Sequence, residues 1–214
     1  MSRAILVASL AVASIAPAVA ARAQPAPREP ISPYVVDVRG AIPFLKQSVE
    51  TAGSLFVSPA DLPGRGWGLV AGAHVYPIRV RGFALGVGGE WFISRARREL
   101  VDATGEPTGG AIARQLDSLS AQLSLNFGHR DGWSYLSGGA GPLTFDTYDD
   151  ASTPDSVRAM TLNYGGGARW FTRPHLAAGF DVRFYITRPS TATAVVGARG
   201  QQTVLVISVG ISVR

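Results

Sequence analysis

Six charged residues have the types and the spacing to form a polar network between strands. Three are acids and three are arginines, and two Asp-Val-Arg triplets supply four of them. The six are Asp37, Arg39, Glu90, Arg169, Asp181 and Arg183. Residues two apart in a strand point to the same face of a sheet, so each triplet places its acid and its arginine on one face. Enclosed charges are costly unless they are paired, and arginine pairs well with carboxylates. We expect an interior network that plugs the protein, with an ion path lined by the same groups as the alternative.

The three histidines, His74, His129 and His175, do not suggest a catalytic set. His74 follows the alternation of the charged residues, and the other two fall in short turns. No spacing brings a histidine together with a serine and a carboxylate, as a hydrolytic triad would need. The sequence therefore favours a non-enzymatic protein and indicates no catalytic residue, no cofactor and no metal ligand.

An acidic stretch in the second half of the chain could hold a calcium ion. Its carboxylates belong to Asp146, Asp149, Asp150 and Asp155. The spacing is not that of an EF-hand, because the central glycine and the final glutamate are missing. A solvated loop is the preferred interpretation of these residues.

The elements that must position these side chains are strands with unlike faces. Residues 82–94 show the pattern, with mostly large apolar side chains at odd positions and small or charged ones at even positions. This length suits a strand that crosses a bilayer at a tilt, which needs about 9–11 residues. Similar segments cover residues 34–44, 67–76, 82–94, 115–128, 133–145, 158–171, 175–187 and 202–214.

The connections between these segments alternate between long and short. The long ones are 45–66, 95–114, 146–157 and 188–201, and the short ones are 77–81, 129–132 and 172–174. Short turns at one end and long loops at the other are typical of an up-and-down membrane barrel. We therefore predict an all-β fold, an eight-stranded antiparallel up-and-down transmembrane β-barrel over residues 34–214. Pro142 should impose a bulge or kink, because proline cannot donate a hydrogen bond.

The first residues have the features of a secretory signal peptide. Arg3 precedes an apolar run, Pro17 interrupts the run, and Ala21-Arg22-Ala23 offers a cleavage site. The rival interpretation, a membrane anchor helix, needs about 18 uninterrupted apolar residues. We predict a signal peptide over residues 1–23 and a proline-rich periplasmic lead-in over residues 24–33.

The composition argues against several other classes of protein. The chain has no cysteine, so it can form neither a disulfide nor a thiolate metal site. Its formal net charge is +5, but the arginines are scattered, which argues against nucleic acid as a partner. Charged residues make up 16% of the chain, below the roughly 25% of soluble domains.

A membrane barrel and a soluble barrel both alternate, and the soluble one turns its apolar face inward. Here the less apolar face is rich in glycine, alanine and serine, which suits a narrow polar lumen better than a water-facing surface. The aromatic residues also sort into two levels on the apolar face, as expected at two headgroup layers. One level holds Tyr34, Phe83, Phe127, Trp133, Tyr135 and Trp170, and the other holds Trp67, Trp91, Phe145, Tyr164 and Phe184. These features favour the membrane barrel.

Residues 163–185, NYGGGARWFTRPHLAAGFDVRFY, resemble a hairpin of known barrels. The resemblance is to small bacterial outer-membrane β-barrels of the OmpA-like, OmpW-like and opacity-protein type, in the hairpin near their end. In these families a glycine-rich strand ends in Arg-aromatic-aromatic, turns at a Thr-x-Pro-like site and returns through an alternating strand. The resemblance implies an outer-membrane location, assembly by the barrel-assembly machinery and no shared catalytic residue. Such barrels usually end in an aromatic residue, whereas this chain ends Ser212-Val213-Arg214.

We therefore expect a monomeric, non-enzymatic outer-membrane barrel with a structural or surface-binding role. Its partners would be outer-membrane lipid and lipopolysaccharide. Arg95, Arg97 and Arg98 lie where a strand should leave the outer leaflet and could bind lipopolysaccharide phosphates, or they could be ordinary loop charges. The alternative functions are a narrow pore for small or apolar solutes and a lipid A-modifying barrel enzyme.

Overall fold

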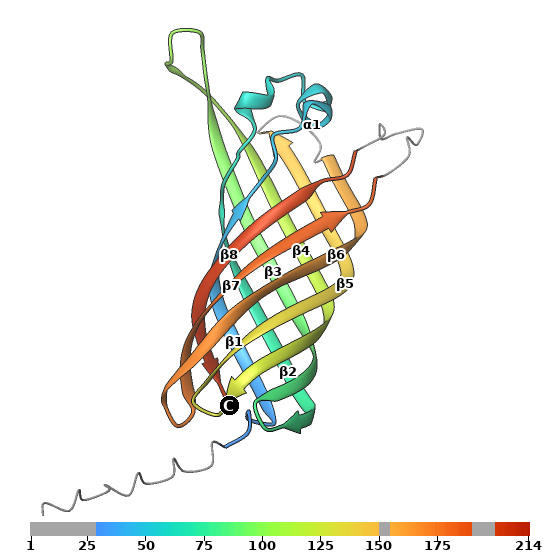
Figure 1. The fold of residues 1–214 in the computed structure, drawn as a ribbon. Coiled ribbons are helices and arrows are strands. Elements are labelled where there is room, and N and C mark those ends of the chain that lie inside the picture. The colour runs from blue at the N-terminus through green and yellow to red at the C-terminus, as the bar shows by residue number, and fades with distance from the viewer. Residues whose placement is uncertain (1–28, 150–154, 190–199) are drawn as a thin grey trace, which may run out of the picture.

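The computed structural model describes residues 29–149, 155–189 and 200–214. Its strands are β1 (Tyr34–Phe44), β2 (Trp67–Val80), β3 (Phe83–Val101), β4 (Pro107–His129), β5 (Gly132–Asp149), β6 (Asp155–Arg173), β7 (Leu176–Thr187) and β8 (Thr203–Val213). Each strand pairs antiparallel with the next, and β1 pairs with β8, so the eight strands form one closed barrel (Figure 1). The predicted fold class is confirmed. The predicted signal peptide and residues 24–28 of the lead-in lie outside the described residues.

The two ends of the barrel differ, as the alternating connections predict. The β2–β3, β4–β5 and β6–β7 connections are short and lie at the lower end in Figure 1, together with the C-terminus; we call this the turn end. The opposite end, the loop end, carries the helix α1 (Val49–Ser54) and the 3-10 helix η1 (Pro59–Asp61). No helix in the described parts of the chain has the length and apolar character needed to span a membrane.

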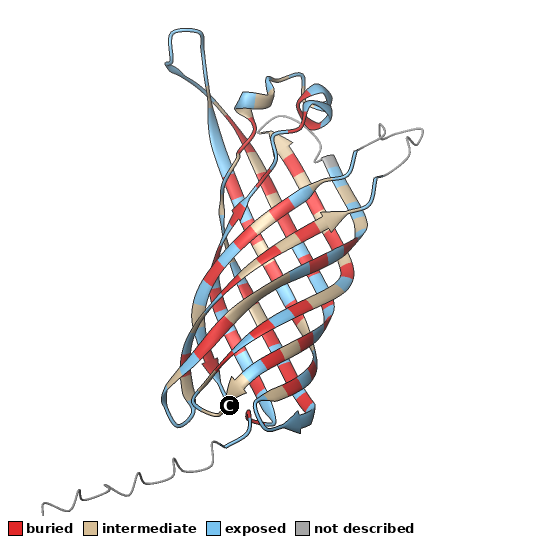
Figure 2. Ribbon diagram, in the orientation of Figure 1, coloured by how far each residue is buried: buried red, intermediate tan, exposed pale blue. Residues whose placement is uncertain are grey.

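Buried and exposed positions alternate along the strands (Figure 2), and many of the exposed residues are large and apolar whereas many of the buried ones are small or polar. On β4, Leu123 is 67% exposed whereas its neighbour Gln122 is 2% exposed. On β8, Ile207 is exposed while Ser208 is buried. A soluble barrel would show the reverse arrangement, so the predicted facing is confirmed on β4 and β8.

The predicted long loop over residues 95–114 is wrong. β3 continues to Val101, β4 begins at Pro107, and the two strands rise beyond the barrel as a paired ribbon (Figure 1). A compact turn closes the ribbon, because Asp102 Oδ1 accepts hydrogen bonds from the Thr104 amide at 2.8 Å, the Thr104 hydroxyl at 2.6 Å and the Glu106 amide at 3.0 Å. The sequence hides this ribbon because polar residues occupy both of its faces.

The turn of the ribbon gives a first prediction. The hydrogen bonds from Thr104 and Glu106 lower the pKa of Asp102, because they favour the charged carboxylate. Because the pKa is lowered, the charged carboxylate stabilises the turn at neutral pH. This stabilisation is lost as the pH falls through the pKa of the folded form. We expect Asp102→Ala to speed amide hydrogen exchange at residues 104 and 106 at neutral pH, with the rest of the barrel unchanged. Unchanged exchange at both amides would contradict this role.

Prolines in the strands act differently from what the sequence predicts. β2 extends past the predicted end at Tyr76, and its register with β3 shifts between Val75 and Ile78, so Pro77 lies at the irregularity. At Pro142 no bulge forms: the register of β5 with β4 is the same on both sides of it, although Gly141 and Pro142 themselves have no paired residue on β4. The structure instead keeps Pro142 paired with Met160 of β6. The expected bulge at Pro142 is therefore wrong.

Candidate functional site: the charged lumen

The six charged residues singled out in the sequence all point into the barrel. β1 contributes Asp37 and Arg39, β3 contributes Glu90, β6 contributes Arg169, and β7 contributes Asp181 and Arg183. Each is at most 4% exposed. Four strands from both halves of the chain thus bring one set of charges into one interior volume.

Glycines on neighbouring strands make room for these long side chains. Arg39 pairs with Gly210 of β8, and Arg183 pairs with Gly165 of β6. A Cβ atom at Gly210 would lie 2.9 Å from Cγ of Arg39, and one at Gly165 would lie 3.1 Å from Cβ of Arg183. The atoms nearest to such Cβ atoms would be the backbone oxygens of Val38 and Val182, so the inward glycines allow the neighbouring strands to approach closely and leave room for the arginine stems.

Arg39 lies at the centre of the network and contacts all three acids. Its Nε is 2.8 Å from Asp37 Oδ1, its Nη2 is 2.5 Å from Glu90 Oε2, and its Nη1 is 3.3 Å from Asp181 Oδ1. These contacts join β1, β3 and β7 across the lumen. The planar guanidinium suits this role because it presents donors in several fixed directions.

The other two arginines complete the balance of charge. Arg169 Nη2 donates to Asp37 Oδ2 at 2.9 Å. Arg183 lies 3.2 Å from Asp181 Oδ2 and 3.3 Å from Glu90 Oε1. Three carboxylates and three guanidinium groups thus form one connected set whose formal charges cancel.

Two tyrosines extend the network, and sequence reasoning missed both. The Tyr135 hydroxyl donates to Asp181 Oδ2 and the Tyr185 hydroxyl donates to Glu90 Oε1, each at 2.9 Å. The Arg169 guanidinium also lies 4.3 Å from the centre of the Tyr135 ring. The two-residue period of β7 could have found Tyr185, which follows the inward Asp181 and Arg183, whereas the inward position of Tyr135 shows only in the pairing of β5 with β4.

Three aromatic residues expected at the membrane surface instead point inward. Trp133, Tyr135 and Phe145 are 3%, 5% and 6% exposed, whereas Leu136 is 62% exposed. On β5 the odd-numbered positions lie on the inner face of the barrel, and all three residues are at odd positions. The two predicted aromatic levels are wrong for these three residues.

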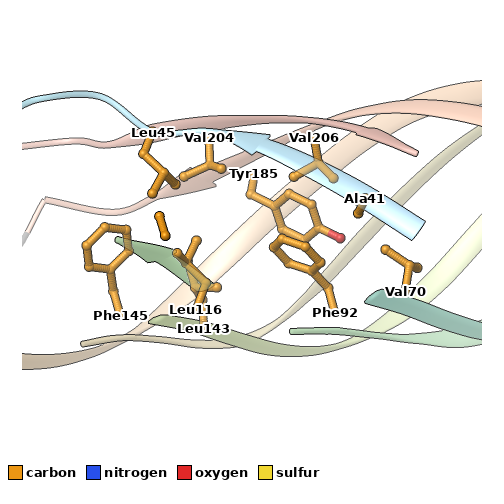
Figure 3. Close-up of a cluster of buried hydrophobic side chains, with 11 residues drawn as sticks. Ala41, Leu45, Val70, Phe92, Leu116, Leu143, Phe145, Tyr185, Val204 and Val206 are labelled. Atoms are coloured by element: carbon orange, nitrogen blue, oxygen red, sulfur yellow. The ribbon is translucent and has the colours of Figure 1, made fainter. Parts of the chain in front are cut away.

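An apolar cluster fills the lumen between the charges and the loop end. Phe92 stacks on Tyr185 with ring centres 5.3 Å apart, and Figure 3 shows these rings facing side chains from several strands. The cluster comprises Ala41, Leu45, Val70, Phe92, Ala96, Leu116, Leu143, Phe145, Tyr185, Val204 and Val206. The lumen is therefore polar only in part, which corrects the expectation of a polar interior throughout.

A second apolar cluster fills the lumen at the turn end. It contains Ile31, Val35, Tyr76, Ala84, Trp133 and Tyr135, with Phe171 packed against it. Ile31 belongs to the lead-in before β1 and is 1% exposed. The lead-in is held by an ion pair between Glu29 and Arg130 and by a hydrogen bond from Arg79 Nη1 to the Ile31 carbonyl. The described part of the lead-in therefore closes this end.

The first loop lies over the other end of the barrel. Arg114 of β4 is 1% exposed, and its Nη1 donates to the carbonyls of Lys46 at 2.9 Å and Pro63 at 3.3 Å. Ala52 and Leu62 of the loop pack with Ile112 at the base of the ribbon. These contacts fix the loop against the ribbon.

Comparisons with known proteins agree with this architecture at the level of the fold. No family model matches the chain, and no curated protein matches it. Among solved structures, Neisserial surface protein A superposes with a TM-score of 0.53 and 12% identity, covering 85% of this chain and 97% of that one. The chain has the fold of the small eight-stranded outer-membrane β-barrels. Ail of Yersinia pestis gives a TM-score of 0.49 at 13% identity, covering 87% of this chain and 98% of that one. OprG of Pseudomonas aeruginosa gives 0.48 at 10%, covering 87% and 97%.

The remaining candidate residues of this eight-stranded barrel lie apart from one another. His74 is buried in the lumen, whereas Nδ1 of His175 lies 3.1 Å from the carbonyl oxygen of Arg214 at the turn end. Asp146 and Asp149 belong to β5, Asp155 begins β6, and Asp150 lies outside the described residues. Over the described ranges, no group of three or more acidic or histidine side chains is arranged to hold a metal ion.

Proposed function

We propose that this protein is a closed, non-enzymatic barrel of the outer membrane with a structural and surface-binding role. The observation that carries the proposal is the filled lumen, in which a neutral ion-pair network lies between two apolar clusters. Eight strands leave an interior that side chains can fill. In the outer membrane, the turn end would face the periplasm, and the ribbon and the first loop would face the outside of the cell.

The first loop has the rigidity that a binding surface needs. Ser48 caps α1, and Ser58 and Asp61 form a capping box at η1. Between them Phe56 has φ of 57° and is 97% exposed. A left-handed backbone is uncommon for a bulky residue and is often found at functional sites. An aromatic side chain held fully in solvent is a suitable contact residue for an external partner.

The two alternative functions make different demands on the molecule. A narrow pore for small or apolar solutes would need a continuous path past Arg39 and past the stacked Phe92 and Tyr185. A lipid A-modifying enzyme would need a histidine and a serine on the outer wall, whereas His74 is buried in the lumen and His129 and His175 lie at the turn end. Altered lipid A in membranes that carry the protein would favour the enzyme.

Conductance tests the proposal directly. Wild-type protein in planar bilayers should give no steady open channel, because charged and apolar layers both block the lumen. A parallel recording of a known open porin at the same protein density controls for insertion. A large and steady conductance from this protein would contradict the closed barrel and favour the pore.

A further inference from the structure

A recess lies on the outer surface where the ribbon leaves the barrel. Its volume is about 290 Å³, and its lining includes Trp67, Arg95, Arg97, Ala113, Arg114 and Tyr148. Trp67 pairs with Arg95, and Ala113 pairs with both Arg97 and Tyr148. The small side chain of Ala113 thus lies between an arginine and a tyrosine, which leaves the hollow open.

Arg95 and Arg97 differ from the lumen arginines because their guanidinium groups have no acidic partner among the described residues. Across residues 29–149, 155–189 and 200–214, neither makes an ion pair or a side-chain hydrogen bond, and both are exposed. No acidic residue lines the recess. Glu99 and Asp146 lie at its borders, where they pair with Ala111 and Gln115. Arg114, the third lining arginine, donates to carbonyls of the first loop, so the two guanidinium groups left for a ligand belong to Arg95 and Arg97.

The recess lies at the height expected of lipid headgroups. On the outer face of β3, the apolar positions end with Trp91 and Ile93, and Arg95 and Arg97 follow. With a rise of about 3.3 Å per residue, Arg95 is about 7 Å along the strand from Ile93. The polar layer on each side of a membrane is about 5–8 Å thick. Trp67 is 70% exposed at this height, as is usual for tryptophan at a membrane interface.

We propose that Arg95 and Arg97 bind a phosphate group of an outer-leaflet glycolipid, the bisphosphorylated lipid A part of lipopolysaccharide. This inference rests on the proposed outer-membrane location. A guanidinium group can bind a phosphate through two parallel hydrogen bonds, and two such groups on one strand face can hold one phosphate between them. Trp67 and Tyr148 form the aromatic walls of the site.

Arg98 provides a matched control on the same ribbon. It is exposed and carries the same charge, but it pairs with the buried Ile112 on the opposite face from Arg95 and Arg97. It does not line the recess. A general effect of positive charge would therefore act through all three arginines, and a specific site only through the first two.

The test is calorimetric titration of the folded protein in micelles with lipid A, lipid A without its phosphates, and inorganic phosphate. We expect wild-type protein to bind lipid A, the double variant R95A/R97A to bind it roughly 100-fold more weakly, and R98A to stay within about threefold of wild type. Equal weakening by R98A, equal binding of the dephosphorylated lipid, or equally tight binding of free phosphate would each overturn the proposal.

A separate control distinguishes this inference from the proposed function. Each variant is first inserted into phosphatidylcholine vesicles that lack lipid A, and its gel mobility is compared before and after boiling. Failure of wild-type protein to insert would contradict the membrane barrel itself. Insertion of all variants with identical lipid A affinities would overturn only the phosphate site.

Discussion

Replacement of Arg39 by leucine is expected to lower the free energy of unfolding by about 3–5 kcal/mol, because removal of one partner from a buried ion pair leaves uncompensated charge. Arg39 contacts Asp37, Glu90 and Asp181 at 2.5–3.3 Å. Without it, three buried carboxylates share the remaining two arginines. Denaturant unfolding of the protein in lipid vesicles, followed by tryptophan fluorescence, measures the change.

The matched control for this variant is Arg98→Leu on the ribbon. The same chemical change at this exposed position should alter the stability by no more than about 0.5 kcal/mol, as is usual for surface substitutions. A cost for Arg39→Leu of less than about 1 kcal/mol would show that the charges are solvated, as in an open ion path.

Replacement of Leu123 by arginine is the second change with a large expected effect. Leu123 lies between Phe127 and Leu119 in the middle of the outward apolar positions of β4 and is 67% exposed. An arginine on the lipid face costs about 2–4 kcal/mol at the bilayer midplane and about 0–1 kcal/mol near the interface. We therefore expect the variant to unfold at lower denaturant concentration in vesicles.

Gln115→Arg is the control for depth, because Gln115 lies on the same strand and pairs with Arg95 above the apolar band. It should cost about 0–1 kcal/mol. Equal costs at the two positions would contradict the account, since depth in a bilayer would then have no effect.

The sequence predicts much of this fold because the two-residue alternation of the strands stops where proline-rich or glycine-rich segments begin. β1 begins and ends at the predicted residues, since its alternation is clear and a proline-rich segment precedes it. The ribbon was missed for the opposite reason. Charged residues such as Arg97 and Arg98 occupy both of its faces, so no two-residue apolar period marks it in the sequence.

The six charged residues of the candidate site could be predicted from the sequence, but Tyr135 and the valines around them could not. Inward acids and arginines must find partners, so their composition alone indicates a network. The hydrogen bond from Tyr135 to Asp181 depends on the register across β5, β6 and β7, which the sequence does not contain in readable form. Likewise Val204 and Val206 occupy the inner face of a strand that is apolar on both sides, so periodicity does not show which valines fill the lumen.

The central claim is that the outward apolar side chains contact lipid. The chain has no cysteine, so single spin labels can be placed by substituting cysteine at Leu119, Ala121, Leu123, Leu125 and Gln115. In vesicles, the first four labels should collide more often with oxygen, which concentrates in acyl chains, than with a water-soluble nickel complex. The label at position 115 should show the reverse. Ready access of the nickel complex to position 123 would contradict a membrane barrel.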